Sequence, residues 1–415
     1  MRVLFAIFPA TAHLHPVVPL AWALRGAGHE VRVAVHPDMA DAVSATGLTP
    51  VPLGDHPLLR GVVEFNSDLE KLNSLTDALV VDGDDDEDWA STWEQLVGTL
   101  MVYRPALDDL VGFCRHWQPE LVIWDPLCVP ASLAARSCGA AHARLLWGQD
   151  NVAWLWAKAR ERLGGDGAQL AEPLSWLMEP MLKEHGLRFD AEMLHGQWTI
   201  DPLPPGLRLP VDEKYVPMRW VPYNGATALP AWLRESPGRP RVCLTLGLGG
   251  RGRQLFRESG VELRQLVDKL AQLDIELVAT VDAAQRAALG TLPPHVRAVS
   301  YVPLDQLLPT CSAVIHHGGD GTIAASTVHE VPQLIVPMAF WGEANAARHV
   351  AARGAGLVVP VSELTADVVQ RQTTRLLEDP SFRTGAAALH AEVRQAPTPR
   401  DTVPVLERLT EQYRQ

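Results

Sequence analysis

The segment Val314–Thr322, with the sequence VIHHGGDGT, carries the strongest chemical signal in this chain. An apolar run passes into a glycine-rich turn and then into a helical stretch, Ile323–His329. Glycines let the backbone approach a phosphate closely, and the first turn of a helix presents free amides and a partial positive charge. Because His316 and His317 add further donors, the pattern predicts a cradle for a phosphate or diphosphate. The alternative is a tight strand-to-helix turn with two buried histidines.

A second reactive pair, His13 and Asp125, follows two predicted strands. His13 lies between a strand at Val3–Phe8 and a helix at Pro16–Ala27, and Asp125 ends the strand Leu121–Asp125. Carboxyl ends of parallel strands meet at one edge of a sheet, so both side chains are expected in the same crevice. A helix N-terminus favours the neutral imidazole, which can accept a proton, and a carboxylate orients the ring. The pair predicts a general base; the alternative is an incidental loop histidine and a helix-capping aspartate.

The segment Gly247–Gly252 opens a different hypothesis, because it matches the pattern G-x-G-x-x-G directly after a predicted strand. In a dinucleotide-binding domain, an acidic residue that holds the ribose follows about 20 residues later. The plausible candidate, Asp282, comes 30 residues after Gly252. A nicotinamide-dependent enzyme is therefore the less supported hypothesis.

Two successive alternations of buried strands and apolar helices position these residues, which predicts an α/β fold with two Rossmann-like domains. Ligands of such sheets bind beyond the carboxyl ends of the strands, so the inter-domain cleft is the expected site. The strands of the first half are predicted at Val3–Phe8, Val31–His36, Leu121–Asp125 and Ala143–Trp147. Those of the second half are predicted at Val242–Gly247, Leu277–Val281, Ala298–Val302, Val314–His317, Leu334–Pro337 and Leu357–Val359.

Prolines mark the boundary between the halves. They occupy nine positions between Asp201 and Pro240, which excludes long regular elements there. The predicted organisation is an N-terminal domain at 1–200, a proline-rich linker at 201–240, a C-terminal domain at 241–398 and a final helix at 399–415.

Composition excludes several classes of protein. The 415 residues carry a formal charge of −13, which is too acidic for a protein that follows nucleic-acid phosphates. The five cysteines lack any C-x-x-C pair, so neither a disulfide framework nor a zinc site is expected. Histidines and prolines interrupt the apolar start of the chain, so no membrane span or targeting segment is expected, and the predicted location is the cytoplasm.

Five motifs occur along the chain: PLAWALRGAGHEV at Pro19–Val31, LLWGQD at Leu145–Asp150, GQWTIDPLP at Gly196–Pro204, RVCLTLG at Arg241–Gly247 and HHGGDGT at His316–Thr322. In these motifs the chain resembles the inverting two-domain glycosyltransferases of actinomycete antibiotic pathways. It is most similar to the branch that transfers TDP-activated deoxysugars or deoxyamino sugars to macrolides and aromatic polyketides, a branch that includes desosaminyltransferases. The fold implied is GT-B, with two facing Rossmann-like domains and an inter-domain cleft.

The resemblance implies roles for individual residues. His13 corresponds to the general base and Asp125 to the acid that holds it. Tyr301 corresponds to the aromatic residue that stacks on the nucleotide base, with the amide of Val302 available to the base edge. The diphosphate loop corresponds to His316, Gly318, Gly319, Gly321 and Thr322, and the other side of the nucleotide to Thr245 and Gly247.

The chain departs from the family pattern at the expected sugar pocket. Many relatives carry an Asp-Gln pair before an Asn-Ala dipeptide, whereas this chain has Trp341 and Gly342 ahead of Asn345. A donor that lacks ring hydroxyls has less use for those acceptors, which favours a deoxysugar, and Glu343 could offer an anion to an amino substituent. Asp320 replaces a small or apolar residue, and we expect it to cap the following helix and to point away from the phosphate.

The resulting hypothesis is an inverting hexosyltransferase that moves a deoxysugar or deoxyamino sugar from a TDP-sugar to a hydroxyl of a lipophilic polyketide aglycone. The N-terminal domain would bind the acceptor and the C-terminal domain the TDP-sugar, without a cofactor or metal. Two alternatives stay open: a nucleotide-sugar epimerase or hydrolase of the same fold, and a non-catalytic nucleotide-sugar-binding homologue.

Two protein partners are also expected. The resemblance implies a cytochrome P450-like auxiliary protein, for which the acidic stretch Asn66–Asp108 is the expected docking surface. The other expected partner is a second copy of the chain, which would form a homodimer. Nucleic acid and membranes are not expected partners.

Overall fold

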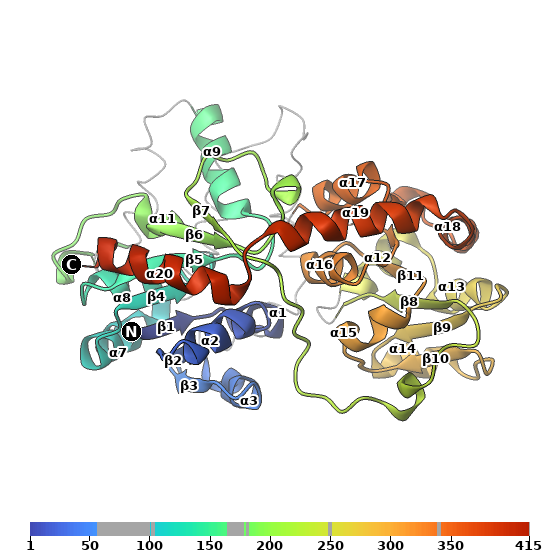
Figure 1. Ribbon diagram of the computed structural model, residues 1–415, viewed down its shortest axis with the longest axis horizontal. Helices are drawn as coiled ribbons and strands as arrows, with labels where there is room; N and C mark the ends of the chain where they lie inside the picture. Colours follow the sequence, from blue (N-terminus) through green and yellow to red (C-terminus); the bar gives the residue numbers. More distant parts are fainter. Residues whose placement is uncertain are drawn as a thin grey trace. The chain divides into compact units, whose positions relative to one another are not determined.

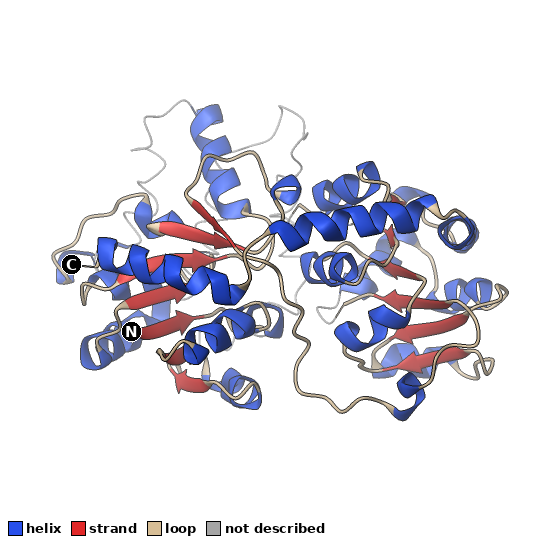
Figure 2. Cartoon of the chain, in the orientation of Figure 1, coloured by secondary structure: helices blue, strands red, loops and turns tan. Residues whose placement is uncertain are grey.

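The computed structural model describes residues 1–55, 100, 104–163, 178–179, 182–247, 251–337 and 342–414. The chain divides into two compact units: Met1–Tyr223 together with Ala396–Gln415, and Asn224–Gln395. Each unit contains one parallel sheet accompanied by helices (Figure 1, Figure 2). The predicted α/β class with two Rossmann-like domains is therefore confirmed.

The sheet of the first unit has, within the described residues, seven parallel strands in the order β3-β2-β1-β4-β5-β6-β7. These strands are β1 Arg2–Ala6, β2 Glu30–Val35, β3 Thr49–Pro52, β4 Leu121–Trp124, β5 Ala141–Leu145, β6 Trp198–Asp201 and β7 Tyr215–Pro217. The described α-helices of this unit include α1 Thr11–Leu14, α2 Val17–Gly26, α3 Ala40–Ala45, α7 Leu107–Trp117, α8 Pro130–Arg136, α9 Asn151–Leu163, α11 Glu192–His195 and α20 Pro399–Tyr413.

The sheet of the second unit has, in the part of the chain that is described, six parallel strands in the order β10-β9-β8-β11-β12-β13. These are β8 Arg241–Thr245, β9 Glu276–Thr280, β10 Val296–Val299, β11 Ala313–His316, β12 Gln333–Ile335 and β13 Gly356–Val358. The helices are α12 Arg251–Ser259, α13 Leu263–Leu270, α14 Ala283–Leu289, α15 Leu304–Leu307, α16 Asp320–Val328, α17 Glu343–Ala352, α18 Ala366–Glu378 and α19 Ser381–Gln395.

The central strands are apolar because both faces of each sheet are covered. Val3, Phe5 and Ile123 are at most 1% exposed and belong to one core cluster of the first unit. Burial of such a side chain stabilises the fold by about 1.5–3 kcal/mol. The buried strands thus hold the loops at their carboxyl ends in place, and those loops carry the candidate site residues.

The observed units differ in extent from the predicted 1–200 and 241–398. The prolines between 201 and 240 do exclude long elements, but the short strand β7 still joins the first sheet, and the first unit ends at Tyr223. The final helix α20 also belongs to this unit and lies beside α2 and β5 (Figure 1). Among the described helices, none has the length and apolar content needed to cross a bilayer.

Candidate active site

His13 and Asp125 lie together at the carboxyl edge of the first sheet. His13 is in α1, which follows β1, and Asp125 follows β4, the parallel neighbour of β1. His13 Nδ1 lies 2.6 Å from Asp125 Oδ2. The other carboxylate oxygen accepts a 2.9 Å hydrogen bond from the Leu127 amide, which fixes the Asp125 side chain. This arrangement favours the tautomer with the proton on Nδ1 and leaves Nε2 able to accept another.

Aromatic rings flank the histidine of this pair. The ring centroids of Phe8 and Trp147 lie 5.0 Å and 4.6 Å from that of His13. The Asp125 side chain is only 4% exposed, whereas His13 retains 12%, so the imidazole is the more accessible member. A small cavity lined by His13, Asp125, Trp147 and the apolar ends of β1, β4 and β5 adjoins the pair. The predicted base is thus an oriented imidazole beside an apolar pocket.

The glycine-rich segment of the second unit connects β11 to α16, as the sequence predicts. The helix begins at Asp320, with Gly319 as its N-cap residue, so Asp320 is not the cap that we expected. A carboxylate in the first helical turn is nevertheless stabilised by the helix dipole. The first amides of α16 have no partner within the helix by its geometry, which makes this turn suitable for an anion.

His316 does not present its ring to a ligand as the sequence hypothesis requires. It is buried, its Nδ1 accepts a 3.1 Å hydrogen bond from the Gly318 amide, and its Nε2 lies 3.0 Å from Gln333 Oε1. Burial lowers the pKa of His316 to about 4, so the ring is neutral at pH 7 and donates from Nε2 to Gln333. Both ring nitrogens of His316 are therefore engaged by the protein itself.

His317 lies between the two glycine segments. A Cβ added at Gly247 would lie 2.8 Å from His317 Nε2, and one added at Gly319 would lie 2.7 Å from Cε1 of the same ring. Both positions therefore need glycine for close approach of this imidazole. The carboxylate of Glu343, which is 1% exposed, lies 3.5 Å from His317 Nδ1. The Glu343 carboxylate is thus directed at His317.

Tyr301 and Val302 follow β10 in the second unit. Tyr301 is 37% exposed, so its ring is accessible for stacking, and its hydroxyl donates to the backbone carbonyl of Asn224. Val302 is buried and belongs to the core of this unit. Thr245, at the end of β8, accepts a 2.8 Å hydrogen bond from Thr280 and pairs in register with His316. The sheet therefore brings Thr245 and the glycine-rich turn to the same edge.

The remaining predicted donor-site residues lie at the starts of α17 and α16. Gly342 caps this helix with a φ of 78°, a conformation that glycine adopts readily. Asn345 is half-buried and accepts a hydrogen bond from Arg348. Gly321 is exposed and Thr322 half-buried, both in the first turn of α16. Trp341 lies outside the described residues, as does most of the expected docking surface Asn66–Asp108.

Several residues of these two sites were not identified from the sequence. Trp147 lies in the motif LLWGQD, which begins at the last residue of β5. Its position just after a strand could have indicated that it belongs to the site. Gln333 and Asn224 had no local signal, because their partners are distant in sequence. Asp282 caps α14 by accepting from the Gln285 amide, so it has a structural role that the dinucleotide hypothesis did not foresee. Within the described ranges, no group of three His, Cys, Asp or Glu is arranged to hold a metal.

Two family models match the chain in succession. The model described as "Erythromycin biosynthesis protein CIII-like, N-terminal domain" matches residues 22–247, and the corresponding C-terminal domain matches residues 264–409. The aclacinomycin-T 2-deoxy-L-fucose transferase of Streptomyces galilaeus is 42% identical, over 100% of this chain and 97% of that protein. The 10-deoxymethynolide desosaminyltransferase of Streptomyces venezuelae is 41% identical, over 100% of this chain and 98% of that protein.

Solved structures agree with these relatives. The glycosyltransferase VinC, in complex with DTDP, superposes with a TM-score of 0.87 at 38% identity, covering 99% of this chain and 100% of that one. The spinosyn forosaminyltransferase SpnP superposes with a TM-score of 0.81 at 41% identity and 99% coverage of both chains. The fold of two Rossmann-like domains is the GT-B fold. The chain therefore belongs to the erythromycin biosynthesis protein CIII-like family and is a glycosyltransferase.

Proposed function

We propose that this enzyme transfers a deoxysugar or deoxyamino sugar from a TDP-sugar to a hydroxyl of a lipophilic polyketide aglycone, with inversion at the anomeric carbon. The observation that carries the proposal is the 2.6 Å contact between His13 and Asp125 beside an apolar cavity. Relatives whose names specify deoxysugars and polyketide acceptors support the substrate classes.

The proton transfer in this mechanism belongs to His13. Its Nε2 takes the proton of the acceptor hydroxyl while the hydroxyl oxygen attacks the anomeric carbon, and the bond from that carbon to the diphosphate oxygen breaks. The Asp125 carboxylate orients the ring and stabilises the imidazolium that forms. Phe8 and Trp147 supply apolar surface for the aglycone on either side of the base.

The donor half of the reaction belongs to the second unit. The amides at the start of α16 bind the diphosphate and stabilise the charge that develops as TDP leaves. Of the two histidines, His317 is the one placed between the glycine segments, whereas both ring nitrogens of His316 are engaged inside the unit. Tyr301 stacks on the thymine, with the Val302 amide at the base edge, and Thr245 and Gly247 line the other side. Because these groups supply the stabilisation, no metal is needed, and activity should survive EDTA.

The decisive experiment combines donors and acceptors in separate arms. The purified chain is incubated with TDP-desosamine or TDP-2-deoxy-L-fucose, with and without 10-deoxymethynolide or aklavinone, and TDP and products are followed by mass spectrometry. A glycosylated aglycone of inverted anomeric configuration is expected. Release of TDP and a new sugar without any acceptor would identify the epimerase or hydrolase alternative. Binding of TDP without turnover in every arm would identify a non-catalytic homologue.

Donor preference tests the sugar pocket. The family resemblance implies a hydrogen-bonding side chain at the position of Gly342, so a sugar hydroxyl there lacks one partner, which costs about 1–3 kcal/mol. A TDP-deoxysugar should therefore exceed TDP-glucose by at least about tenfold in kcat/KM. Preference for glucose would show that other residues hold its hydroxyls. The P450-like auxiliary protein, the homodimer and the cytoplasmic location stay predictions.

A further inference from the structure

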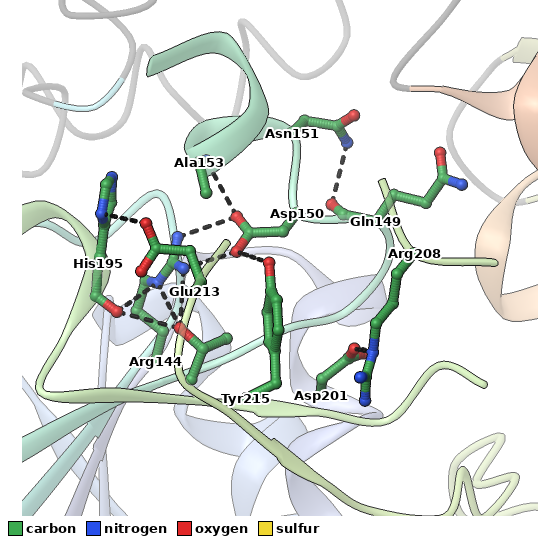
Figure 3. Close-up of polar contacts among 11 residues, drawn as sticks. Arg144, Gln149, Asp150, Asn151, Ala153, His195, Asp201, Arg208, Glu213 and Tyr215 are labelled. Carbon is green, nitrogen blue, oxygen red and sulfur yellow. Dashed lines mark hydrogen bonds and ion pairs between the residues drawn. The ribbon is translucent and has the colours of Figure 1, made fainter. Parts of the chain in front are cut away.

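A buried network of charged and polar side chains lies beside the loop that joins β5 to α9 in the first unit (Figure 3). Arg144, fully buried in β5, forms two parallel hydrogen bonds to Asp150, of 3.0 Å from Nη1 to Oδ1 and 2.6 Å from Nη2 to Oδ2. Its Nε donates to the His195 carbonyl over 2.8 Å, and Nη2 also donates to Thr199 Oγ1 over 2.8 Å. The guanidinium is thus held from two sides in one orientation.

Asp150 receives two further hydrogen bonds. The hydroxyl of Tyr215 donates to Oδ2 over 2.9 Å, and the Ala153 amide, in the first turn of α9, donates to Oδ1 over 3.1 Å. Burial and the adjacent carboxylate raise the pKa of Tyr215, so its hydroxyl stays a donor. Arg144 pairs in register with Thr199, and Thr199 with Tyr215, so the network crosses β5, β6 and β7 in one row.

The Arg144–Asp150 pair closes the loop that follows β5. Inside this closed segment, the Leu146 amide donates to the Ile200 carbonyl over 3.0 Å, and Gln149 Nε2 donates to the Leu207 carbonyl over 2.6 Å. Trp147 lies between these two anchor points, and its ring faces His13 at a centroid distance of 4.6 Å. The segment that carries the Trp147 ring is therefore fixed at both ends.

The cost of burying charge argues for a role in geometry. Replacing a buried ion pair by apolar residues is often neutral or stabilising, so the pair by itself is weak evidence of stability. Two parallel hydrogen bonds between a guanidinium and a carboxylate give each of the two side chains a defined direction. Here Arg144 belongs to β5, before the Trp147 loop, and Asp150 is the residue directly before α9.

We propose that Arg144, Asp150 and Tyr215 are positioning residues of the transfer reaction: the network sets the place of Trp147 against His13 and thereby the approach of the acceptor hydroxyl to Nε2. The proposal rests on the function proposed above, in which His13 is the base. It assigns no chemical step to the network, which acts through Trp147.

Tyr215→Phe is the informative variant, because it removes one hydrogen bond and keeps the ring. Asp150→Asn would leave the Arg144 charge buried without a full partner and is prone to misfolding. Tyr413→Phe is the matched control: it also removes a phenolic partner in the first unit, that of the Lys214 ammonium at 2.8 Å, outside the network. Trp147→Leu removes the ring through which the network is proposed to act.

The first readout needs no acceptor. In protein labelled with ¹³C-histidine, the His13 ring signal, assigned by its loss in His13→Gln, reports the neighbouring Trp147 ring current. Tyr215→Phe should move this signal part of the way toward its position in Trp147→Leu, and Tyr413→Phe should leave it in place. A His13 signal that Trp147→Leu moves and Tyr215→Phe does not would overturn the proposal, whatever the enzyme's substrates are.

The second readout is turnover with the best donor and acceptor pair. Tyr215→Phe should lower kcat about threefold to tenfold, the scale of one buried hydrogen bond, with the Kd for TDP unchanged. In the Trp147→Leu background the same substitution should have no further effect, because the ring through which it acts is gone. Equal losses of kcat in both backgrounds, or a matching loss of TDP affinity, would show a merely structural role.

Discussion

At the scale of single residues, the two histidine sites of this enzyme differ in how their nitrogens are used. His13 has one nitrogen bound to Asp125 and stays 12% exposed, whereas both nitrogens of His316 are engaged inside the second unit. The first arrangement suits proton transfer and the second suits a neutral structural histidine. The two histidines therefore differ in burial and in the contacts of their ring nitrogens.

His13→Ala should lower kcat about 10²- to 10⁴-fold, the usual contribution of a positioned base, and leave the Kd for TDP nearly unchanged. The reason is that His13 belongs to the first unit and the diphosphate loop to the second. Steady-state kinetics and calorimetry with TDP measure the two quantities. His116→Ala, at an exposed position of α7, is the control. Full turnover in His13→Ala would remove His13 from the catalytic role.

His316→Gln should change the dependence of stability on pH. The pKa of His316 is about 4 in the folded chain and near 6.5 when unfolded, so its contribution is present above pH 6.5 and lost as pH falls toward 4. As pH falls between those values, the free energy of unfolding of the wild type should decrease more steeply than that of His316→Gln, by up to about 1.4 kcal/mol per pH unit. Urea unfolding of both proteins at about pH 7 and pH 5 measures this; parallel losses would mean that His316 is solvated.

At the scale of elements, the edge positions of two strands explain why a proline-rich stretch can still contain a strand. Pro50 and Pro52 lie in β3, and Pro217 lies in β7, and these two strands are the edges of the first sheet. A proline lacks the amide that a central strand needs on both sides, but an edge strand leaves one side unpaired. The proline-rich stretch therefore contributes a strand while it still excludes long elements.

The final helix α20 should stabilise the first unit although it begins 182 residues after the end of β7 in sequence. Leu406 is fully buried in the core cluster of that unit, so Leu406→Ala should lower the free energy of unfolding by about 2–5 kcal/mol. Leu229→Ala, at a side chain 40% exposed, makes the same chemical change and should have little effect. Denaturant unfolding compares the two, and equal values would contradict the packing of α20.

At the scale of the whole molecule, the proposed function divides proton transfer and nucleotide binding between the two units. His13, Asp125 and Trp147 lie in the first unit, and the glycine-rich turn and Tyr301 lie in the second. Each sheet presents its candidate residues at the carboxyl ends of its strands. The proposed reaction needs groups from both.

TDP should stabilise the chain mainly through the second unit. At a concentration 100 times its Kd, a ligand of the folded state adds about 2.7 kcal/mol of stability. Hydrogen–deuterium exchange with and without TDP should show the strongest protection at the turn between β11 and α16, and weaker change around α1. Thymidine alone should protect the segment at Tyr301 more than that turn. Strongest protection in the first unit would contradict the assignment of the donor site.

The α/β class, most central strands, the location of His13 and Asp125 in one crevice and the position of the glycine-rich turn could be predicted from the amino-acid sequence alone. These follow from local patterns: apolar runs define buried strands, and parallel strands bring their carboxyl ends to one edge. Contacts between residues that are distant in sequence became known only from the tertiary structure. Gln333 of β12 and the Gly318 amide engage the ring of His316, Trp147 lies against His13, and β7 and α20 join the first unit. Each depends on a partner that only strand order or helix docking brings into contact, and a one-dimensional pattern carries no record of that order.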